Sequence, residues 1–161
     1  MPSKSSESST PLRAYQYALR LLNARDYTVG RLREKLGSKG FISADSDDAL
    51  SRLVAEGWVN DRRFAERFAE SAMASGRYYG TRLRQEMRRR GLAPELVAEV
   101  LGALAPEHDE CQDMRIVFQR RFSGFSFDTA SDKEKRRVIG YLMRRGFGYP
   151  AVMRLLKLSE Y

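Results

Sequence analysis

The chain has 161 residues, of which 31% are charged and 42% are hydrophobic, a composition typical of a globular protein and not of a disordered one. Its net charge of +8 favours a polyanionic or acidic partner. Cys111 is the only cysteine, which excludes an intrachain disulfide, and no run approaches the roughly 20 apolar residues that span a bilayer. We therefore expect a cytoplasmic protein without membrane contact.

The first 59 residues predict a polar tail followed by three helices. Residues 1–11 are polar and rich in serine, and we expect them to form a disordered tail. Thr28 is suited to cap the second helix, and Gly40 to end it in the left-handed conformation. An aspartate-rich loop leads to the third helix. From apolar residues that recur at three and four, the predicted helices cover residues 11–25, 28–39 and 47–56.

The rest of the chain repeats this arrangement twice. Asn60 and Asp61 are competent N-caps, and Pro94 fits the first turn of a helix. In the second repeat, the first predicted helix begins after Asn60 and Asp61, and the next two cover residues 81–90 and 94–104. In the third repeat, the first predicted helix begins near residue 107, and the next two cover residues 131–145 and 149–158. We predict an all-α fold of three tandem three-helix, helix-turn-helix-like repeats that form an elongated, curved array. The expected repeats are residues 12–59, 60–106 and 107–161.

One segment occurs three times, and this is the clearest sign of repeats. Residues 32–41 return at 83–92 and, less closely, at 138–147. In each copy two apolar residues lie four apart, and a glycine follows a basic residue and precedes a large apolar one. Because an array of similar modules offers an extended surface, the repeats favour a binding protein over an enzyme with one catalytic pocket.

Positive charge is concentrated in the second helix of each repeat. Residues 31–39 carry a net charge of +3, residues 77–90 carry +5 and residues 132–145 carry +4, so the remainder is net negative. One such helix is usually only a solvated face, but three equivalent helices favour binding to phosphate or to an acidic protein surface. The candidate binding residues are Arg31, Arg33, Lys35, Arg77, Arg82, Arg84, Arg88, Arg89, Lys135, Arg136 and Arg144.

Motifs for catalysis are missing from the sequence. No glycine-rich phosphate loop is present, so we expect no NTPase activity. With a single histidine, His108, and a single cysteine, one chain can assemble neither a zinc site nor a Cys–His nucleophile pair. We expect no cofactor, no metal and no enzymatic activity. Trp58 is expected to pack between repeats and not to stack on a nucleic-acid base.

A longer motif in the middle of the chain resembles a known family. Residues 59–68 read Val-Asn-Asp-Arg-Arg-Phe-Ala-Glu-Arg-Phe, and the motif continues through Gly76, Tyr79 and Gly80, residues 83–87, and residues 90–92. This motif is similar to the signature of the bacterial RecX regulatory proteins. That signature consists of an acidic cap, an Arg-Phe-Ala helix, a glycine-bounded turn, a basic helix and a helix stop in which a glycine lies between a basic and an apolar residue. Residues 31–36 and 39–41 resemble the family's first unit, and the likeness covers residues 12–158.

This resemblance implies a partner and a function. It implies a non-enzymatic regulator that binds the RecA recombinase filament and inhibits its ATPase, strand-exchange and coprotease activities, thereby modulating recombination, DNA repair and the SOS response. We expect a monomer that contacts single- and double-stranded DNA through phosphates, with weak sequence preference. Capping and disassembly of the filament both stay open as mechanisms. The third repeat departs from the family pattern at Gly140 and Tyr141.

The alternative is a sequence-specific helix-turn-helix transcriptional regulator. A reading helix normally carries Arg, Asn or Gln toward base edges. Residues 94–101 carry none of these, and Glu95 and Glu99 would be repelled by phosphate. This pattern counts against base reading by that helix.

Overall fold

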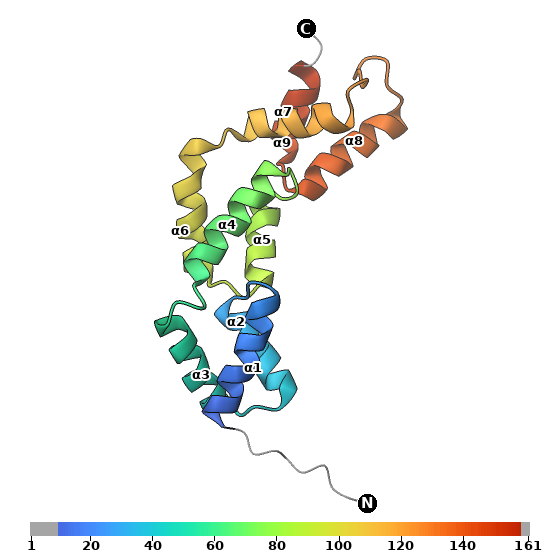
Figure 1. Ribbon diagram of the computed structural model, residues 1–161. Coiled ribbons are helices and arrows are strands. Elements are labelled where there is room, and N and C mark those ends of the chain that lie inside the picture. Colours follow the sequence, from blue (N-terminus) through green and yellow to red (C-terminus); the bar gives the residue numbers. More distant parts are fainter. Residues whose placement is uncertain (1–9, 159–161) are drawn as a thin grey trace, which may run out of the picture. The chain divides into compact units, whose positions relative to one another are not determined.

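The computed structural model describes residues 10–158, and within them the chain is entirely helical, with no strand (Figure 1). No helix in this part of the chain is long and apolar enough to cross a membrane. The elements are α1 (Pro11–Ala24), α2 (Val29–Lys39), α3 (Ser43–Ala55), α4 (Asp61–Ala74), α5 (Gly80–Arg89), α6 (Pro94–Leu104), the 3-10 helix η1 (Ala105–Glu107), α7 (Glu110–Arg121), α8 (Asp132–Arg145) and α9 (Tyr149–Leu158).

These helices belong to two compact units. Unit 1 comprises residues 10–65 together with 90–93, and unit 2 comprises residues 66–89 together with 94–158. The chain passes from unit 1 to unit 2 within α4, returns to unit 1 at the end of α5, and enters unit 2 again at the start of α6. The expected three-repeat boundaries stay a prediction, because compactness alone does not separate three repeats.

The core of unit 1 lies where α1, α2 and α3 meet. Buried apolar side chains come from all three helices: Ala14, Ala18, Leu32, Leu36, Ala49, Leu50 and Leu53. Tyr17 and Phe41 pack against this core with their ring centroids 5.9 Å apart. Small alanines on α1 allow the helices to approach closely, while the leucines fill the space between them.

Unit 2 has a larger aromatic core. Its buried cluster combines α7, α8 and α9 with the turn before α5: Tyr79, Met114, Val117, Phe118, Val138, Leu142, Phe147, Val152, Leu155 and Leu156. The rings of Tyr79 and Phe147 are stacked with centroids 4.3 Å apart. Burial raises the pKa of Tyr79 to about 12, so this phenol stays protonated and its hydroxyl donates to the Met73 carbonyl at 2.6 Å.

The thrice-repeated segment behaves as the sequence predicts. In all three copies the two apolar residues four apart are buried, with at most 1% of the side chain exposed: Leu32 and Leu36, Leu83 and Met87, Val138 and Leu142. The stop glycines have positive φ, at 97° for Gly40, 83° for Gly91 and 107° for Gly146. Glycine adopts this left-handed conformation readily because it has no side chain. The prediction that these three glycines end their helices is therefore confirmed.

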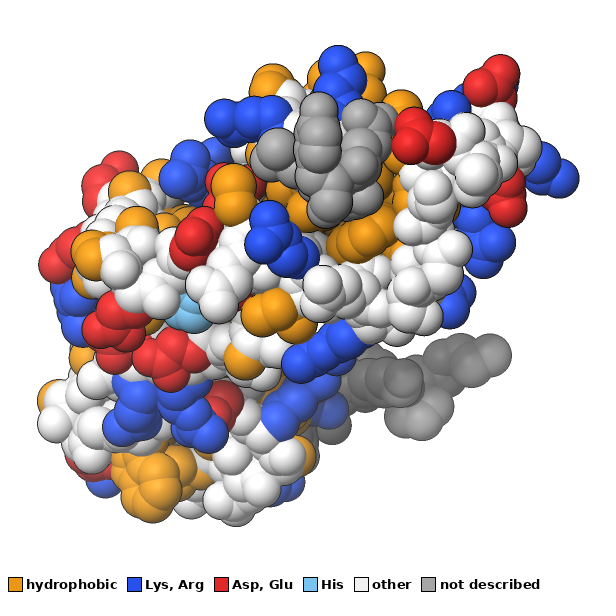
Figure 2. Space-filling view, turned by 90° about the horizontal axis from the view of Figure 1, so that it is seen from above, with side chains coloured by type: hydrophobic (Ala, Val, Ile, Leu, Met, Phe, Trp, Pro, Cys, Tyr) orange, Lys and Arg blue, Asp and Glu red, His pale blue; other side chains and the backbone are white. Residues whose placement is uncertain are grey.

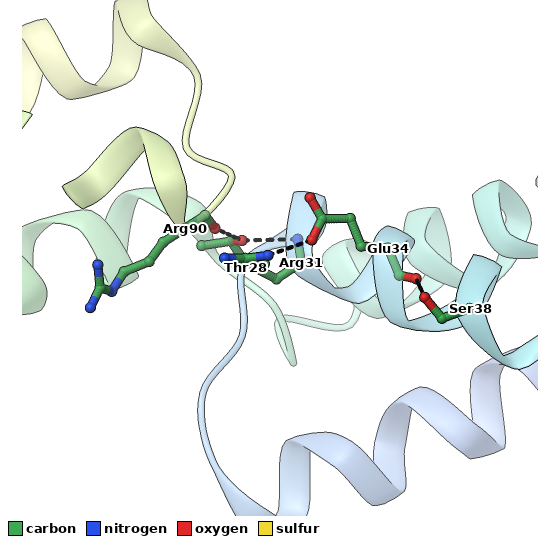
Figure 3. Close-up of polar contacts among 5 residues, drawn as sticks. All are labelled: Thr28, Arg31, Glu34, Ser38 and Arg90. Atoms are coloured by element: carbon green, nitrogen blue, oxygen red, sulfur yellow. Dashed lines mark hydrogen bonds and ion pairs between the residues drawn. The ribbon is translucent and has the colours of Figure 1, made fainter. Parts of the chain in front are cut away.

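Two of these stops also pack against the start of an earlier second helix, which the sequence did not suggest. In unit 1, the Thr28 hydroxyl caps α2 and also donates to the Arg90 carbonyl (Figure 3). A Cβ on Gly91 would lie 3.1 Å from the Cα of Gly30. In unit 2, the Tyr79 N–H donates to the Arg145 carbonyl at 2.7 Å. The carbonyl before each stop glycine therefore satisfies a donor at another helix's N-terminus.

Three expectations need correction. The helix predicted over 47–56 spans Ser43–Ala55, because Asp45 lies in its first turn, where a carboxylate is favourable. The helix expected near residue 107 begins at Glu110, after a 3-10 turn, and is capped by Asp109. Trp58 does not serve as a packing residue, because 55% of it is exposed.

The expected disordered tail overlaps the first helix by one residue. Pro11 begins α1 and Thr10 caps it, accepting from the Arg13 N–H, so residues 10 and 11 of the expected tail belong to the first helix and its cap. The remainder of the expected tail, residues 1–9, lies outside the described residues.

Candidate anion-binding surface

The arginines of α5 fall into two sets, those that pair with the buried carboxylate of Glu86 and those that do not. The side chain of Glu86 is only 7% exposed, and its carboxylate lies 2.8 Å from Arg82 and 3.5 Å from Arg89. Arg82 and Arg89 thus stabilise the fold, because burying a carboxylate without a partner costs free energy of folding. Arg84 and Arg88, by contrast, are exposed, one helical turn apart, and have no ion pair within the described part of the chain.

Arg77 adds a third exposed cation in the turn before α5. This turn begins at Gly76, whose φ is 68° and whose N–H donates to the Met73 carbonyl at 2.9 Å. Residues 77–79 then lead directly into α5. Arg77, Arg84 and Arg88 are therefore the residues of this region best placed to bind an anion from solvent.

The basic side chains of α2 are mostly paired within unit 1. Arg31 contacts the Glu34 carboxylate at 2.6 Å (Figure 3), and Arg33 contacts Asp47 of α3 at 3.0 Å. Lys39 lies over the Tyr17 ring, with its ammonium 5.8 Å from the centroid. Lys35 is exposed and has no ion pair among residues 10–158. Of the α2 candidates, only Lys35 is thus uncommitted.

Helix α8 presents a similar division. The Lys135 ammonium lies 4.5 Å from the centre of the Phe127 ring. The Glu134 carboxylate is held by Ser131 in a capping box, and these hydrogen bonds lower the pKa of Glu134. Arg136 and Arg144 are exposed, and neither forms an ion pair in the part that the structure describes. Both charges are thus open to an external anion.

The eleven predicted residues fall into two groups, with Lys135, which lies over the Phe127 ring, set apart. All are at least partly exposed, and the arginines of α2 and α5 that pair with carboxylates are Arg31, Arg33, Arg82 and Arg89. We call the predicted residues that are exposed and have no ion pair within residues 10–158 the open cations: Lys35, Arg77, Arg84, Arg88, Arg136 and Arg144. Figure 2 shows Lys and Arg side chains interspersed with acidic and apolar ones on the face in view.

Arg145 shows why charge counting overestimates the binding surface. Its guanidinium donates to the Gly76 carbonyl at 2.7 Å and lies 4.8 Å from the centre of the Tyr141 ring. This arginine holds the end of α8 against the turn before α5 and is part of the fold of unit 2. Nothing in its local sequence distinguishes it from its neighbour Arg144.

Helix α6 lacks the side chains of a base-reading helix. Val97 and Val100 are buried, and the exposed residues include Glu95 and Glu99 but no Arg, Asn or Gln. Among residues 10–158, no three His, Cys, Asp or Glu side chains are grouped so that they could hold a metal ion. The chemistry of the described surface is thus that of phosphate and carboxylate binding by guanidinium and ammonium groups.

The fold and this surface define a class: an all-helical protein of three-helix units whose second helices present open cations. Two family models match the chain, the second three-helix domain of RecX over residues 60–101 and the first three-helix domain of RecX over residues 14–53. The chain belongs to the RecX family of regulatory proteins.

Relatives of similar length support this assignment. The chain is 40% identical to the regulatory protein RecX of Trichlorobacter lovleyi over 150 residues, which cover 93% of this chain and 97% of that protein. It is 40% identical to RecX of Syntrophotalea carbinolica over 134 residues, 83% of this chain and 88% of that protein. RecX of Haemophilus influenzae is 33% identical over 136 residues, 83% of this chain and 86% of that protein.

Solved structures agree with the fold. The crystal structure of RecX from Lactobacillus salivarius matches with a TM-score of 0.73 at 15% identity, covering 93% of this chain and 96% of that one. A second crystal structure of a regulatory protein RecX matches with a TM-score of 0.72 at 17% identity, covering 91% of this chain and 72% of that one. At such low identity the likeness concerns the fold alone.

Proposed function

We propose that this protein binds the RecA nucleoprotein filament and inhibits its ATPase, strand-exchange and coprotease activities without catalysing a reaction itself. Membership of the RecX family supports a regulatory role. A partner of this kind would place the protein in the cytoplasm, where the recombinase assembles on DNA.

The observation that carries the proposal is the set of open cations. They lie on or beside α2, α5 and α8, each of which is the second helix of a predicted repeat. Guanidinium groups that are not neutralised internally can bind phosphate with two parallel hydrogen bonds. Because such contacts involve the backbone and not the base edges, they suit a filament that covers DNA of any sequence.

The transcriptional-regulator alternative has no comparable support. A base-reading helix must aim hydrogen-bonding side chains into the major groove. The exposed side of α6 offers Glu95 and Glu99 instead, which face a phosphate backbone unfavourably. No described feature favours sequence-specific reading.

The proposal is tested by measuring ATP hydrolysis by the cognate RecA on single-stranded DNA. Substoichiometric amounts of this protein should lower the rate, because blocking growth at a filament end affects many subunits. Recombinase without this protein sets the reference rate, and this protein without recombinase should hydrolyse no ATP. Unchanged recombinase turnover at a molar excess of this protein would refute the proposed function.

A further inference from the structure

Helix α8 carries a glycine in its interior where the packing of unit 2 does not require one. Gly140 and Tyr141 are the residues at which the third repeat departs from the family pattern. Tyr141 packs edge-on against the Phe122 ring, with the centroids 5.2 Å apart, and so belongs to the core. Gly140 has no positive φ, and a Cβ added there would meet no atom of another helix within 4 Å. Because glycine destabilises a helix interior relative to alanine, its presence needs another reason.

The side chain that lies against Gly140 is that of Arg144. A Cβ on Gly140 would lie 3.1 Å from Nη1 of the Arg144 guanidinium. Helical side chains point toward the N-terminus, so this guanidinium lies one turn back, over the bare backbone of Gly140. Gly140 is accordingly only partly exposed, whereas Gly37 and Gly102, which have no atom within 4 Å of an added Cβ, are exposed. Gly140 thus leaves room for one guanidinium close to the helix.

The cations of α8 lie on two sides of the helix. At 100° per residue, the buried Val138 and Leu142 lie opposite Gly140, so Gly140 is at the centre of the solvent-facing side. Lys135 and Arg145 lie about 140° from Gly140, and each is placed over an aromatic ring. The two cations that take part in packing are therefore far from Gly140 around the helix.

The remaining cations are closer to Gly140. Lys133, Arg136 and Arg144 lie within about 40° of it around the helix. All three are exposed, and none has an ion pair within residues 10–158. We call the row formed by these residues the α8 stripe: Lys133, Arg136, Gly140 and Arg144.

The carboxylates of α8 do not neutralise this stripe. Asp132 lies one turn before Arg136, but the structure has no ion pair between them. Glu134 lies about 120° from the centre of the stripe. Its carboxylate accepts a hydrogen bond from the Ser131 hydroxyl at 2.7 Å, and its pKa is lowered by the hydrogen bonds from Ser131 and, less strongly, by the charge of Arg137. The cations of the stripe are therefore available to an anion from solvent.

The shape and composition of the stripe favour a phosphate backbone over a protein surface. Residues 133 to 144 extend about 16 Å along the helix, the axial length of roughly five nucleotides of one DNA strand. Met143, at the edge of the stripe, is the only large apolar side chain of α8 that is exposed. The centre of a protein interface is usually apolar and depleted of charge, whereas DNA is contacted mostly at its phosphates.

We propose that the α8 stripe is a DNA phosphate-binding site of the third repeat, in which Gly140 lets the Arg144 guanidinium lie against the helix. Held in this way, the guanidinium loses less conformational entropy when it binds a phosphate. This inference rests on the proposed function, which supplies DNA as the partner. It deepens that function by assigning a DNA contact to the repeat that departs from the family pattern, and by giving Gly140 a role in binding.

The test compares Gly140→Gln with Gly102→Gln, a matched control because Gly102 is an exposed glycine of α6 with no atom within 4 Å of an added Cβ. Both substitutions keep the net charge and introduce a better helix former, so neither variant should melt below the parent. Gly140→Gln should bind single-stranded DNA roughly threefold more weakly. Its slope of log affinity against log salt should fall by about 0.7, the value of one phosphate contact. Gly102→Gln should match the parent in affinity and slope.

A second comparison tests whether Gly140 acts through Arg144. Arg144→Gln should lower the affinity and the slope by the same amounts as Gly140→Gln. The variant with both substitutions should bind DNA as each single variant does, because both remove the same contact. Losses of affinity that add in the double variant would show that Gly140 does not act through Arg144, and would overturn the proposal.

The remaining outcomes separate this inference from the proposed function. If Gly140→Gln binds DNA as the parent does while the parent inhibits recombinase turnover, the phosphate site is wrong and the regulatory role stands. If Gly140→Gln loses affinity for recombinase filaments but not for naked DNA, the stripe contacts protein and the inference is overturned. If the parent leaves recombinase turnover unchanged and Gly140→Gln still weakens DNA binding as expected, the proposed function fails and the phosphate site is supported.

Discussion

Replacing Gly146 with alanine should destabilise the protein much more than the same replacement at Gly40. Both glycines end a second helix in the left-handed conformation, with φ of 107° and 97°. An L-residue in this conformation costs about 1 kcal/mol. No atom lies within 4 Å of a Cβ added at Gly40, so this conformational cost is the whole effect there. Gly40→Ala is therefore the matched control.

At Gly146 the packing adds to that cost. A Cβ there would overlap the Tyr79 carbonyl oxygen and approach the Arg82 Cβ to 2.8 Å. Relief requires the end of α8 to move away, which breaks the 2.7 Å hydrogen bond from Tyr79 to Arg145 and separates the stacked rings of Tyr79 and Phe147. The hydrogen bond contributes about 1 kcal/mol and the ring pair a similar amount. The total is about 3 kcal/mol.

The assay is thermal unfolding of the full chain, followed by circular dichroism. For a protein of this size, 1 kcal/mol lowers Tm by roughly 3 °C, so Gly40→Ala should lower Tm by about 3 °C and Gly146→Ala by about 9 °C. Equal losses at the two positions would refute the reasoning, because they would show that the Gly146 stop is not packed against Tyr79.

Two further predictions concern charge. Arg84→Gln combined with Arg88→Gln should reduce the slope of log affinity against log salt for single-stranded DNA by about 1.4, since each lost phosphate contact removes about 0.7. Arg82→Gln combined with Arg89→Gln should change that slope less and lower Tm more, because Glu86 is buried between these two residues; equal slopes for both variants would contradict the division into open and paired cations. Hydrogen bonds from Tyr15 and Arg52 lower the pKa of Glu56 below 4.5, so its contribution to stability is present at neutral pH and is lost as the pH falls through the lowered pKa. Glu56→Gln should therefore melt below the parent at neutral pH and converge with it in strong acid, and a Tm difference that persists there would disprove this linkage.

Much of the fold could be predicted from local sequence. Apolar residues that recur at every third or fourth position predict that Leu32 and Leu36 lie on the buried side of a helix, as do their counterparts in the other two repeats. Thr28 and Ser131 cap α2 and α8, and Gly40 and Gly146 end them. Buried faces, caps and stops depend on residues within one or two helical turns. They can therefore be predicted from local sequence whatever the helix packs against. The start of α3 differs from the expected loop, because Ile42 caps this helix without a side-chain hydrogen bond and so gives no capping signal in the sequence.

The candidate site could be predicted only in part. The basic second helices were identified from charge, but their division into open and paired cations was not. The pairing of Arg82 with Glu86 has a local signal, the i,i+4 spacing, which could have been used. The pairing of Arg33 with Asp47 joins two helices and depends on how α2 meets α3.

The sequence by itself determined the helices, their caps and stops, the buried faces and the excess of positive charge. Only the tertiary structure decided that Arg145 reaches the Gly76 carbonyl across 69 residues and that Thr28 reaches Arg90 across 62. It also decided that 55% of Trp58 is exposed. The physical reason is range: helix formation is governed by neighbours along the chain, whereas the partner of a long side chain is whichever group the packing of other helices brings within hydrogen-bond distance.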